Sequence, residues 1–150
     1  MKFEINYRPT TADKIRTFQT QYNILLASDY VEFLLRNNGG KAVKRRFDTK
    51  DDTITSSIML FLPLDAEEDK NLESYFINYN LGEIVPKHLV PIGIDPADNL
   101  ICISVDDKSR GDVYFCDIGY FEQDQGLKKE HILLIANSFS EFLDLLYIPE

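Results

Sequence analysis

The chain has 150 residues, of which 44% are hydrophobic and 27% are charged. Asp and Glu number 25 against 16 Lys and Arg, so the formal net charge is −9 at pH 7. This balance argues against a nucleic-acid-binding protein and against docking on an anionic membrane, because both partners present negative charge. The length is that of one domain, so we expect a single domain over residues 1–150.

From the sequence we expect neither a secretion signal nor a disulfide framework. Charged residues interrupt the N-terminal stretch, and the longest apolar run, 58–64, is far shorter than the roughly 20 residues of a membrane-spanning helix. Cys102 and Cys116 are the two cysteines, too few for a disulfide-rich secreted chain. We therefore expect a cytoplasmic monomer with reduced thiols and no cofactor.

Apolar residues at helical spacing predict two helices in the N-terminal part of the chain. The first spans 11–22, with Thr10 or Thr11 as its N-cap. The second runs over 28–37, with Ser28 as its cap.

The period then changes to that of strands, and a last helix follows. Strands are predicted over 42–47, 56–63, 90–94, 100–105, 113–118 and 131–136, with a short helix over 71–80. The last helix begins at Ser138, where Glu141 three residues later completes a capping box. Helices at both ends with strands between them indicate an α+β fold.

The segments 100–105 and 113–118 form the best candidate for a β-hairpin. A register centred on Ser109 places Cys102 opposite Cys116. Both faces of this hairpin are apolar, which predicts a central position in the sheet with cover on both sides.

The sequence contains few of the motifs that are typical of enzymes. There is no glycine-rich phosphate loop and no His or Cys pair at zinc-binding spacing. Cys116 and Asp117 could meet His88 or His131 in a thiol–imidazole–carboxylate set. The interpretation that we favour is a buried strand cysteine that packs as a small apolar side chain.

Three further motifs have a structural interpretation. The acidic stretch 95–99 lacks the spacing of a calcium loop and is typical of a turn whose side chains bond their own backbone. The Arg-Gly-Asp triplet at 110–112 falls at the predicted hairpin tip. The basic run within 41–46 is an alternative nucleic-acid patch, but charges that guard an edge strand explain it better.

The acidic stretches are the most informative surface feature. Each is compatible with an ordinary solvated surface, whereas together they would suit a basic protein partner, since complementary charge speeds association and gives specificity. Tyr75, Tyr79, Tyr114 and Tyr120 could add aromatic anchors, although we expect half of them in the core. The candidate partner-binding residues are Asp65, Glu67, Glu68, Asp69, Asp106, Asp107, Asp112, Asp117, Glu122 and Asp124.

Four segments carry motifs that occur in one order and spacing over about residues 10–147. They are Leu-Ala-Ser-Asp-Tyr-Val-Glu-Phe-Leu-Leu-Arg-Asn-Asn-Gly-Gly at 26–40, a Pro-rich stretch at 86–101, an aromatic strand at 111–117 and Ala-Asn-Ser-Phe-Ser-Glu-Phe-Leu at 136–143. Together they resemble the SUKH superfamily, which includes fungal cell-wall synthesis regulators of the Smi and Knr type and many bacterial immunity proteins. Three positions depart from its pattern: Ala27 replaces the usual Pro, Asp98 a frequent Gly, and Cys116 an aromatic residue.

The resemblance implies an α+β domain with a mostly antiparallel sheet flanked by N-terminal and C-terminal helices, and no catalysis. It also implies a cytosolic antidote that binds a toxin, often a nuclease, of a polymorphic or contact-dependent system. Such a toxin is expected to be basic because it must hold nucleic acid. The alternatives are a regulatory scaffold for cellular partners and a small enzyme that uses Cys116.

Overall fold

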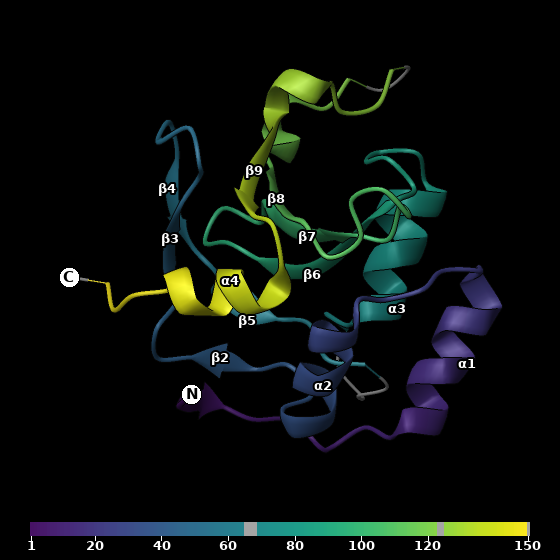
Figure 1. Cartoon of the computed structure of the whole chain (residues 1–150). Helices are drawn as coiled ribbons and strands as arrows, with labels where there is room; N and C mark the ends of the chain where they lie inside the picture. The colour runs from purple at the N-terminus through teal and green to yellow at the C-terminus, as the bar shows by residue number, and fades with distance from the viewer. Residues whose placement is uncertain (65–68, 123–124, 150) are drawn as a thin grey trace.

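The computed structural model, which describes residues 1–64, 69–122 and 125–149, places helices near both ends of the chain and most strands between them (Figure 1). The helices are α1 (Ala12–Tyr22), α2 (Ser28–Arg36), α3 (Leu72–Tyr75), its π-helical continuation η1 (Phe76–Leu81), the 3₁₀ turns η2 (Ile118–Tyr120) and η3 (Lys129–His131), and α4 (Phe139–Leu145). The strands are β1 (Phe3–Ile5), β2 (Lys41–Ala42), β3 (Arg46–Asp48), β4 (Thr55–Ser57), β5 (Leu60–Phe61), β6 (Leu89–Ile94), β7 (Leu100–Ser104), β8 (Val113–Cys116) and β9 (Ile132–Ala136).

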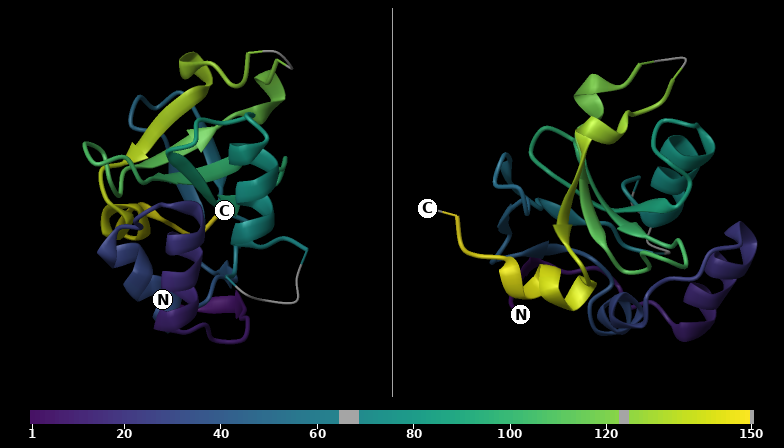
Figure 2. Two further views of the ribbon diagram at one scale, coloured as in Figure 1. Left: turned by 90° about the vertical axis from the view of Figure 1, so that its right-hand side faces the viewer. Right: turned by 45° about the horizontal axis from the view of Figure 1, so that its top comes forward.

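The main sheet has five antiparallel strands in the order β5-β6-β7-β8-β9. Two smaller antiparallel pairs, β1–β2 and β3–β4, accompany it. Helix α4 contacts β9, whereas α3 and η1 contact β6, and these helices lie on different sides of the sheet (Figure 2). The predicted α+β fold with a mostly antiparallel sheet is therefore confirmed.

Two of the predicted strands are each divided in two. The segment 42–47 contributes to β2 and β3, and 56–63 contributes to β4 and β5. The division occurs because each half has a different partner: β2 pairs with β1, β3 with β4, and β5 with β6. Between β2 and β3, the N–H of Arg45 donates instead to the carbonyl of Tyr147, 3.1 Å away.

Strand β7 lies at the centre of the main sheet, and all five of its residues are buried, as predicted for a hairpin covered on both faces. The predicted register is wrong, because Cys102 pairs with Tyr114 and not with Cys116. The turn is set by Gly111, which adopts a φ of +94° and donates its N–H to the carbonyl of Ser104. This geometry offsets the strands by two residues and leaves the two cysteines as diagonal neighbours on one face.

The two N-terminal helices begin differently. Helix α1 follows the predicted cap Thr11, whose Oγ1 accepts a hydrogen bond from the backbone three residues later, at 3.2 Å. The prediction for α2 is wrong, because Ser28 is its first helical residue and Ala27 occupies the cap position without a side-chain bond. The entry to α2 is held instead by Leu26, which is buried and donates its N–H to Gln19 Oε1 at 2.8 Å.

The predicted capping box of α4 is confirmed with one difference. Ser138 Oγ accepts from the N–H of Glu141 at 2.9 Å. The Glu141 carboxylate accepts in return from the N–H of Asn137, one residue before the cap, at 3.0 Å. The start of this helix is therefore encoded within five consecutive residues.

Aromatic side chains fill the core where α2 and α4 meet the sheet. Phe139 of α4 lies 5.0 Å from Tyr30 and 4.9 Å from Phe33, measured between ring centroids. Phe33 is also 5.0 Å from Phe61 of β5. Each of these four rings is at most 2% exposed, so this cluster joins both helices to the edge of the main sheet.

The turn at 95–99 and the Arg-Gly-Asp triplet both have the predicted structural role. Asp95 Oδ1 accepts from the N–H groups of Ala97 and Asn99, at 2.9 and 2.8 Å, which makes this carboxylate part of a turn. Arg110, at the hairpin tip, donates from Nε to the carbonyl of Leu25 at 3.0 Å. The side chain of this arginine therefore fastens the tip to the segment before α2.

Candidate functional site

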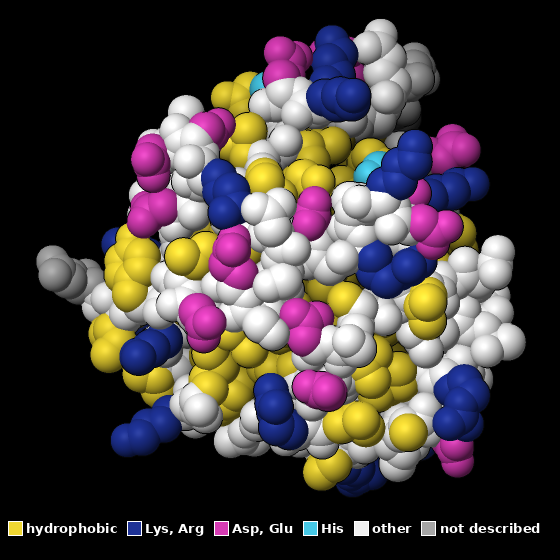
Figure 3. All heavy atoms as spheres, in the orientation of Figure 1, with side chains coloured by type: hydrophobic (Ala, Val, Ile, Leu, Met, Phe, Trp, Pro, Cys, Tyr) yellow, Lys and Arg dark blue, Asp and Glu magenta, His cyan; other side chains and the backbone are white. Residues whose placement is uncertain are grey.

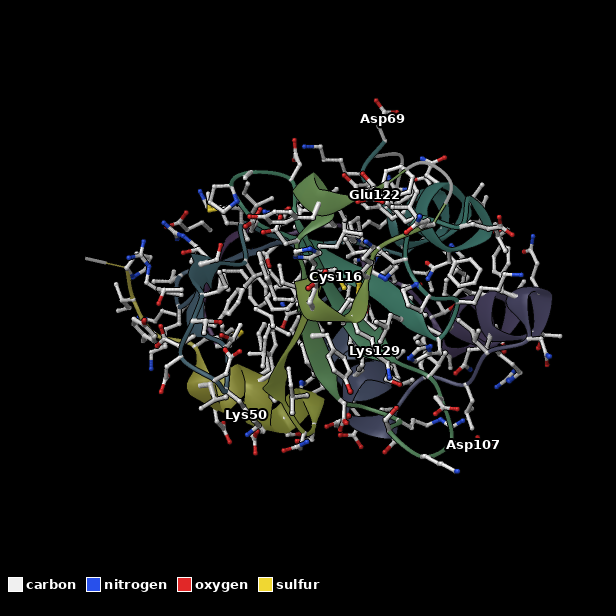
Figure 4. All side chains as sticks on the ribbon, turned by 90° about the horizontal axis from the view of Figure 1, so that it is seen from above. Lys50, Asp69, Asp107, Cys116, Glu122 and Lys129 are labelled. Carbon is white, nitrogen blue, oxygen red and sulfur yellow. The ribbon has the colours of Figure 1, made fainter. Side chains whose placement is uncertain are left out.

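The structure does not gather the predicted partner-binding acids into one surface. Asp65, Glu67, Glu68 and Asp124 lie outside the described residues. Seen from above, Asp69 and Asp107 lie on opposite sides of the molecule (Figure 4). A single partner of ordinary size would therefore not be expected to contact all of the predicted acids.

The acids of the hairpin loop are engaged locally. Asp107 Oδ1 accepts from Arg110 Nη2 at 2.7 Å. Asp112 is hydrogen-bonded to the half-buried Tyr114, and burial together with this carboxylate raises the pKa of the Tyr114 phenol. Asp106 is exposed, and its carbonyl accepts from the N–H of Ser109. These contacts are those of a stable turn.

A groove of about 350 Å³ lies at one end of the sheet, between the β3–β4 turn and the segment that joins β8 to β9. The two sides are held together by Lys50, whose N–H donates to the carbonyl of Leu134 in β9 at 2.9 Å. Figure 1 shows the β3–β4 hairpin standing beside β9. We call this feature the acidic groove, and its polar lining consists of Asp51, Thr53, Asp117, Tyr120, Glu130 and His131.

An exposed aromatic ring stands in the acidic groove. Tyr120 of η2 is 59% exposed and stacks on His131, with ring centroids 4.0 Å apart and an interplanar angle of 1°. Asp117 positions η2, because its Oδ1 accepts from the N–H of Gly119 at 3.3 Å. A tyrosine that is ordered by stacking yet largely exposed is typical of a binding surface, since it offers contact area with little loss of conformational freedom.

The carboxylates give this groove its charge. Asp51 Oδ1 accepts from the hydroxyls of Thr49 and Thr53, both at 2.7 Å, and these hydrogen bonds lower the pKa of the Asp51 carboxyl. Glu130 lies 3.7 Å from His131 Nε2. Figure 3 shows acidic side chains gathered over the β3–β4 hairpin. An aromatic ring among carboxylates is suited to hold an Arg or Lys side chain of a partner.

The lysines near the acidic groove lie outside its lining. Glu122, another predicted residue, is exposed and forms an ion pair with Lys128 at 3.8 Å. Lys128 and Lys129 precede Glu130 but do not line the acidic groove. Its lining, as far as the structure describes the chain, thus includes three carboxylates and no lysine or arginine.

Asp117 and Tyr120 were predicted from the sequence, whereas Asp51 and Glu130 were missed. Asp51 lies in a polar turn between two predicted strands. Such a turn indicates a loop and gives no indication of a binding site. The adjacency of this turn to Asp117 depends on a bond between residues far apart in the chain. A pattern within a short stretch of sequence therefore could not have predicted that Asp51 and Asp117 share a groove.

The chemistry of a thiol enzyme finds no support in the geometry. Cys102 and Cys116 are both 0% exposed, and burial with the neighbouring Cys116 raises the pKa of the Cys102 thiol. A thiol that is closed off from solvent cannot reach a substrate and is a poor candidate for a nucleophile. One face of the His131 ring is covered by the stacked ring of Tyr120. Within the described residues, no group of His, Cys, Asp and Glu could hold a metal ion.

None of the described helices has the length and apolar character needed to cross a membrane.

Comparison with known families agrees with the four motifs. The model of the SMI1 / KNR4 family (SUKH-1) matches residues 9–145, nearly the whole chain, which confirms the resemblance inferred from the sequence. This family is associated with immunity proteins and is generally non-catalytic. A search of curated proteins found no match.

Proposed function

Because the chain belongs to the SMI1 / KNR4 family (SUKH-1), we propose that it is a bacterial immunity protein that binds and neutralises a cognate toxin in the cytoplasm. The toxin is a basic protein, in our proposal a nuclease of a polymorphic or contact-dependent system. Neutralisation is stoichiometric and needs no catalysis by the chain.

The acidic groove is the observation that carries this proposal. Tyr120 supplies an exposed aromatic anchor, and Asp51, Asp117 and Glu130 surround it with negative charge. Aromatic residues at the centre of an interface commonly contribute most of its binding energy, while charges around them set the rate and specificity of association. A nuclease offers the matching chemistry, because its substrate site must attract phosphate.

Two modes of inhibition are compatible with this arrangement. The carboxylates can occupy the phosphate-binding residues of the toxin, or the body of the chain can cover its active site. In both modes the net charge of −9 steers a basic toxin toward the chain over a distance set by the salt concentration.

A growth assay tests the proposal. The open reading frame beside this gene is expressed alone in a bacterial host and then together with the chain. We expect growth arrest from the neighbouring product alone and recovery on co-expression. The variant Tyr120→Ala should rescue less well at equal protein level, while Glu32→Gln, an exposed substitution in α2, should rescue like the wild type.

Other outcomes would redirect the interpretation. A harmless neighbouring product that does not bind the chain would favour a regulatory scaffold for cellular partners. Rescue that is lost in Cys116→Ser but kept in Tyr120→Ala would favour the enzyme hypothesis.

A further inference from the structure

A second groove, of about 760 Å³, lies between α4, the end of α2, the segment that follows β2 and the two ends of the described chain. Its volume is more than twice that of the acidic groove. In Figure 3, hydrophobic side chains gather in the lower left part of the visible face, with charged side chains of both signs around them. We call this feature the basic groove.

The floor of the basic groove is apolar. Val43 and Leu143 are half-buried, and Leu146 is 4% exposed. Met1 and Ile148 also line the groove and are each 58% exposed. Exposed apolar side chains that gather around a hollow are typical of an interaction site, whereas scattered ones need no explanation.

The rim carries positive charge, opposite in sign to the net charge of the chain. Of the described residues, Lys2, Arg36 and Lys44 line the groove together with one carboxylate, Asp144. Among the residues that the structure describes, none of these three cations has a carboxylate within 4 Å. The groove therefore offers three cations that are available to a ligand.

The basic run of the sequence explains why the charge is concentrated here. Lys41 and Arg45 pair with Glu4 of β1, at 3.6 and 3.5 Å, so those two members hold β1 and β2 together. Lys44 lies between them in the chain and lines the groove instead. Two residues of the run thus form ion pairs within the fold, and a third supplies positive charge to the groove.

We propose that the basic groove binds an acidic, amphipathic segment of a partner protein. The apolar side chains of this segment pack against Val43 and Leu146, and its carboxylates pair with Lys2, Arg36 and Lys44. Charge complementarity favours this occupant. An anionic membrane is the less suitable ligand, because the net charge of −9 is repelled from it and the apolar floor is concave. The proposal is independent of the toxin site, since the two grooves share no lining residue.

Selection from a random peptide library displayed on phage tests the proposal without a known partner. The full-length chain is the bait, and the double variant Lys44→Glu/Arg36→Glu is the counter-bait. We expect the peptides that prefer the wild type to be rich in Asp, Glu and large apolar residues. A synthetic peptide of the enriched sequence should bind the double variant at least about tenfold more weakly, as measured by fluorescence anisotropy. Its affinity for wild type should fall between about 50 and about 300 mM NaCl.

Matched controls separate groove binding from a general charge effect. Lys129→Glu/Lys128→Glu makes the same charge change beside the acidic groove and should leave peptide affinity unchanged. Ile148→Ser removes an exposed apolar contact and should weaken binding about threefold or more without lowering the denaturation midpoint.

Three results would overturn the proposal. One is a selection that yields no peptide sensitive to the double variant. Another is co-sedimentation of the chain with phosphatidylglycerol vesicles that the double variant abolishes, which would assign the groove to a membrane. The third is a dimer in sedimentation velocity that the double variant converts to a monomer, which would assign it to a second copy of the chain.

Discussion

The carboxylate of Asp29 in α2 accepts hydrogen bonds from the N–H and the hydroxyl of Ser140 in the first turn of α4, at 2.9 and 3.1 Å. The two residues are 111 positions apart in the chain. Asp29 thus places a negative charge where the N-terminus of α4 leaves N–H groups without helical partners. It therefore orients one helix on the other above the aromatic core.

Removing this contact should destabilise the fold. Asp29→Ala is expected to lower the free energy of unfolding by about 1 to 2 kcal/mol. The variant leaves the N–H of Ser140 without its hydrogen-bond acceptor and removes a contact between α2 and α4. Urea denaturation followed by circular dichroism measures the change, with Glu32→Gln on the same helix as control. A midpoint equal to that of the wild type would show that Asp29 does not hold α4.

The local cap of α4 makes a separate contribution. Ser138→Ala removes the acceptor of the Glu141 N–H and should cost on the order of 1 kcal/mol in the same measurement. Since Ser138 and Asp29 both satisfy N–H groups of the first turn, their effects should not be fully additive. Strictly additive effects would mean that the two caps act independently.

The phenol of Tyr22 makes stability depend on alkaline pH. Burial and the 2.7 Å hydrogen bond to Glu73 Oε2 raise the pKa of Tyr22 to about 12, against about 10 in an unfolded chain. The neutral phenol is therefore favoured in the fold, and its contribution is fully present below about pH 10 and lost as pH rises through about 12.

The unfolding free energy measured across this window should fall less steeply in Tyr22→Phe than in the wild type. Parallel curves would show that the phenol does not titrate differently in the two states.

Tyr120 should be the main anchor for the toxin. Tyr120→Ala is expected to weaken toxin binding at least about tenfold, the usual effect of removing a central aromatic residue from an interface. Ile77→Ala, which truncates an exposed apolar side chain of η1, is the control and should not affect binding. If both variants bind like the wild type, the toxin site lies elsewhere.

Cys116 should be dispensable for function. Cys116→Ala leaves the sheet apolar at this position, so toxin binding should be unchanged and stability should fall by about 1 kcal/mol. Titration calorimetry measures the toxin binding, and urea denaturation measures the stability. A large loss of toxin neutralisation with a folded variant would speak for thiol chemistry.

The elements that could be predicted from the sequence are those whose signals are local. Thr11 and Ser138 cap helices through backbone groups three residues later, so a short window contains the whole interaction. The hairpin register depends on the conformation of Gly111, and a turn centred one residue away looks equally good in sequence. This is why both faces of β7 were foreseen and the pairing of Cys102 was not.

The four family motifs describe the scaffold, not the binding surface. Asp29 and Tyr30 of the first motif contact Ser140 and Phe139 of the fourth, so these two motifs meet across the core. The second and third motifs pair as neighbouring strands, and Asn99 Oδ1 accepts from the N–H of Ile118, the first residue of η2. A resemblance carried by such residues predicts the fold well.

The candidate site could be predicted only in part. Asp117 and Tyr120 stood out by residue type, but their neighbours Asp51 and Glu130 join them through folding of the chain. Several other acids chosen for their charge are far apart in space, as Asp69 and Asp107 show (Figure 4). Charge along the sequence does not reveal which residues share a surface.

The most direct test of the central claim is a calorimetric titration of the chain with the C-terminal domain of the neighbouring gene product. Wild type and the double variant Asp117→Asn/Glu130→Gln are compared at about 50 and about 300 mM NaCl. The account predicts one-to-one binding that weakens with salt, and a double variant with lower affinity and a shallower salt dependence. Equal affinity and equal salt dependence for both proteins, or no binding by the wild type, would contradict it.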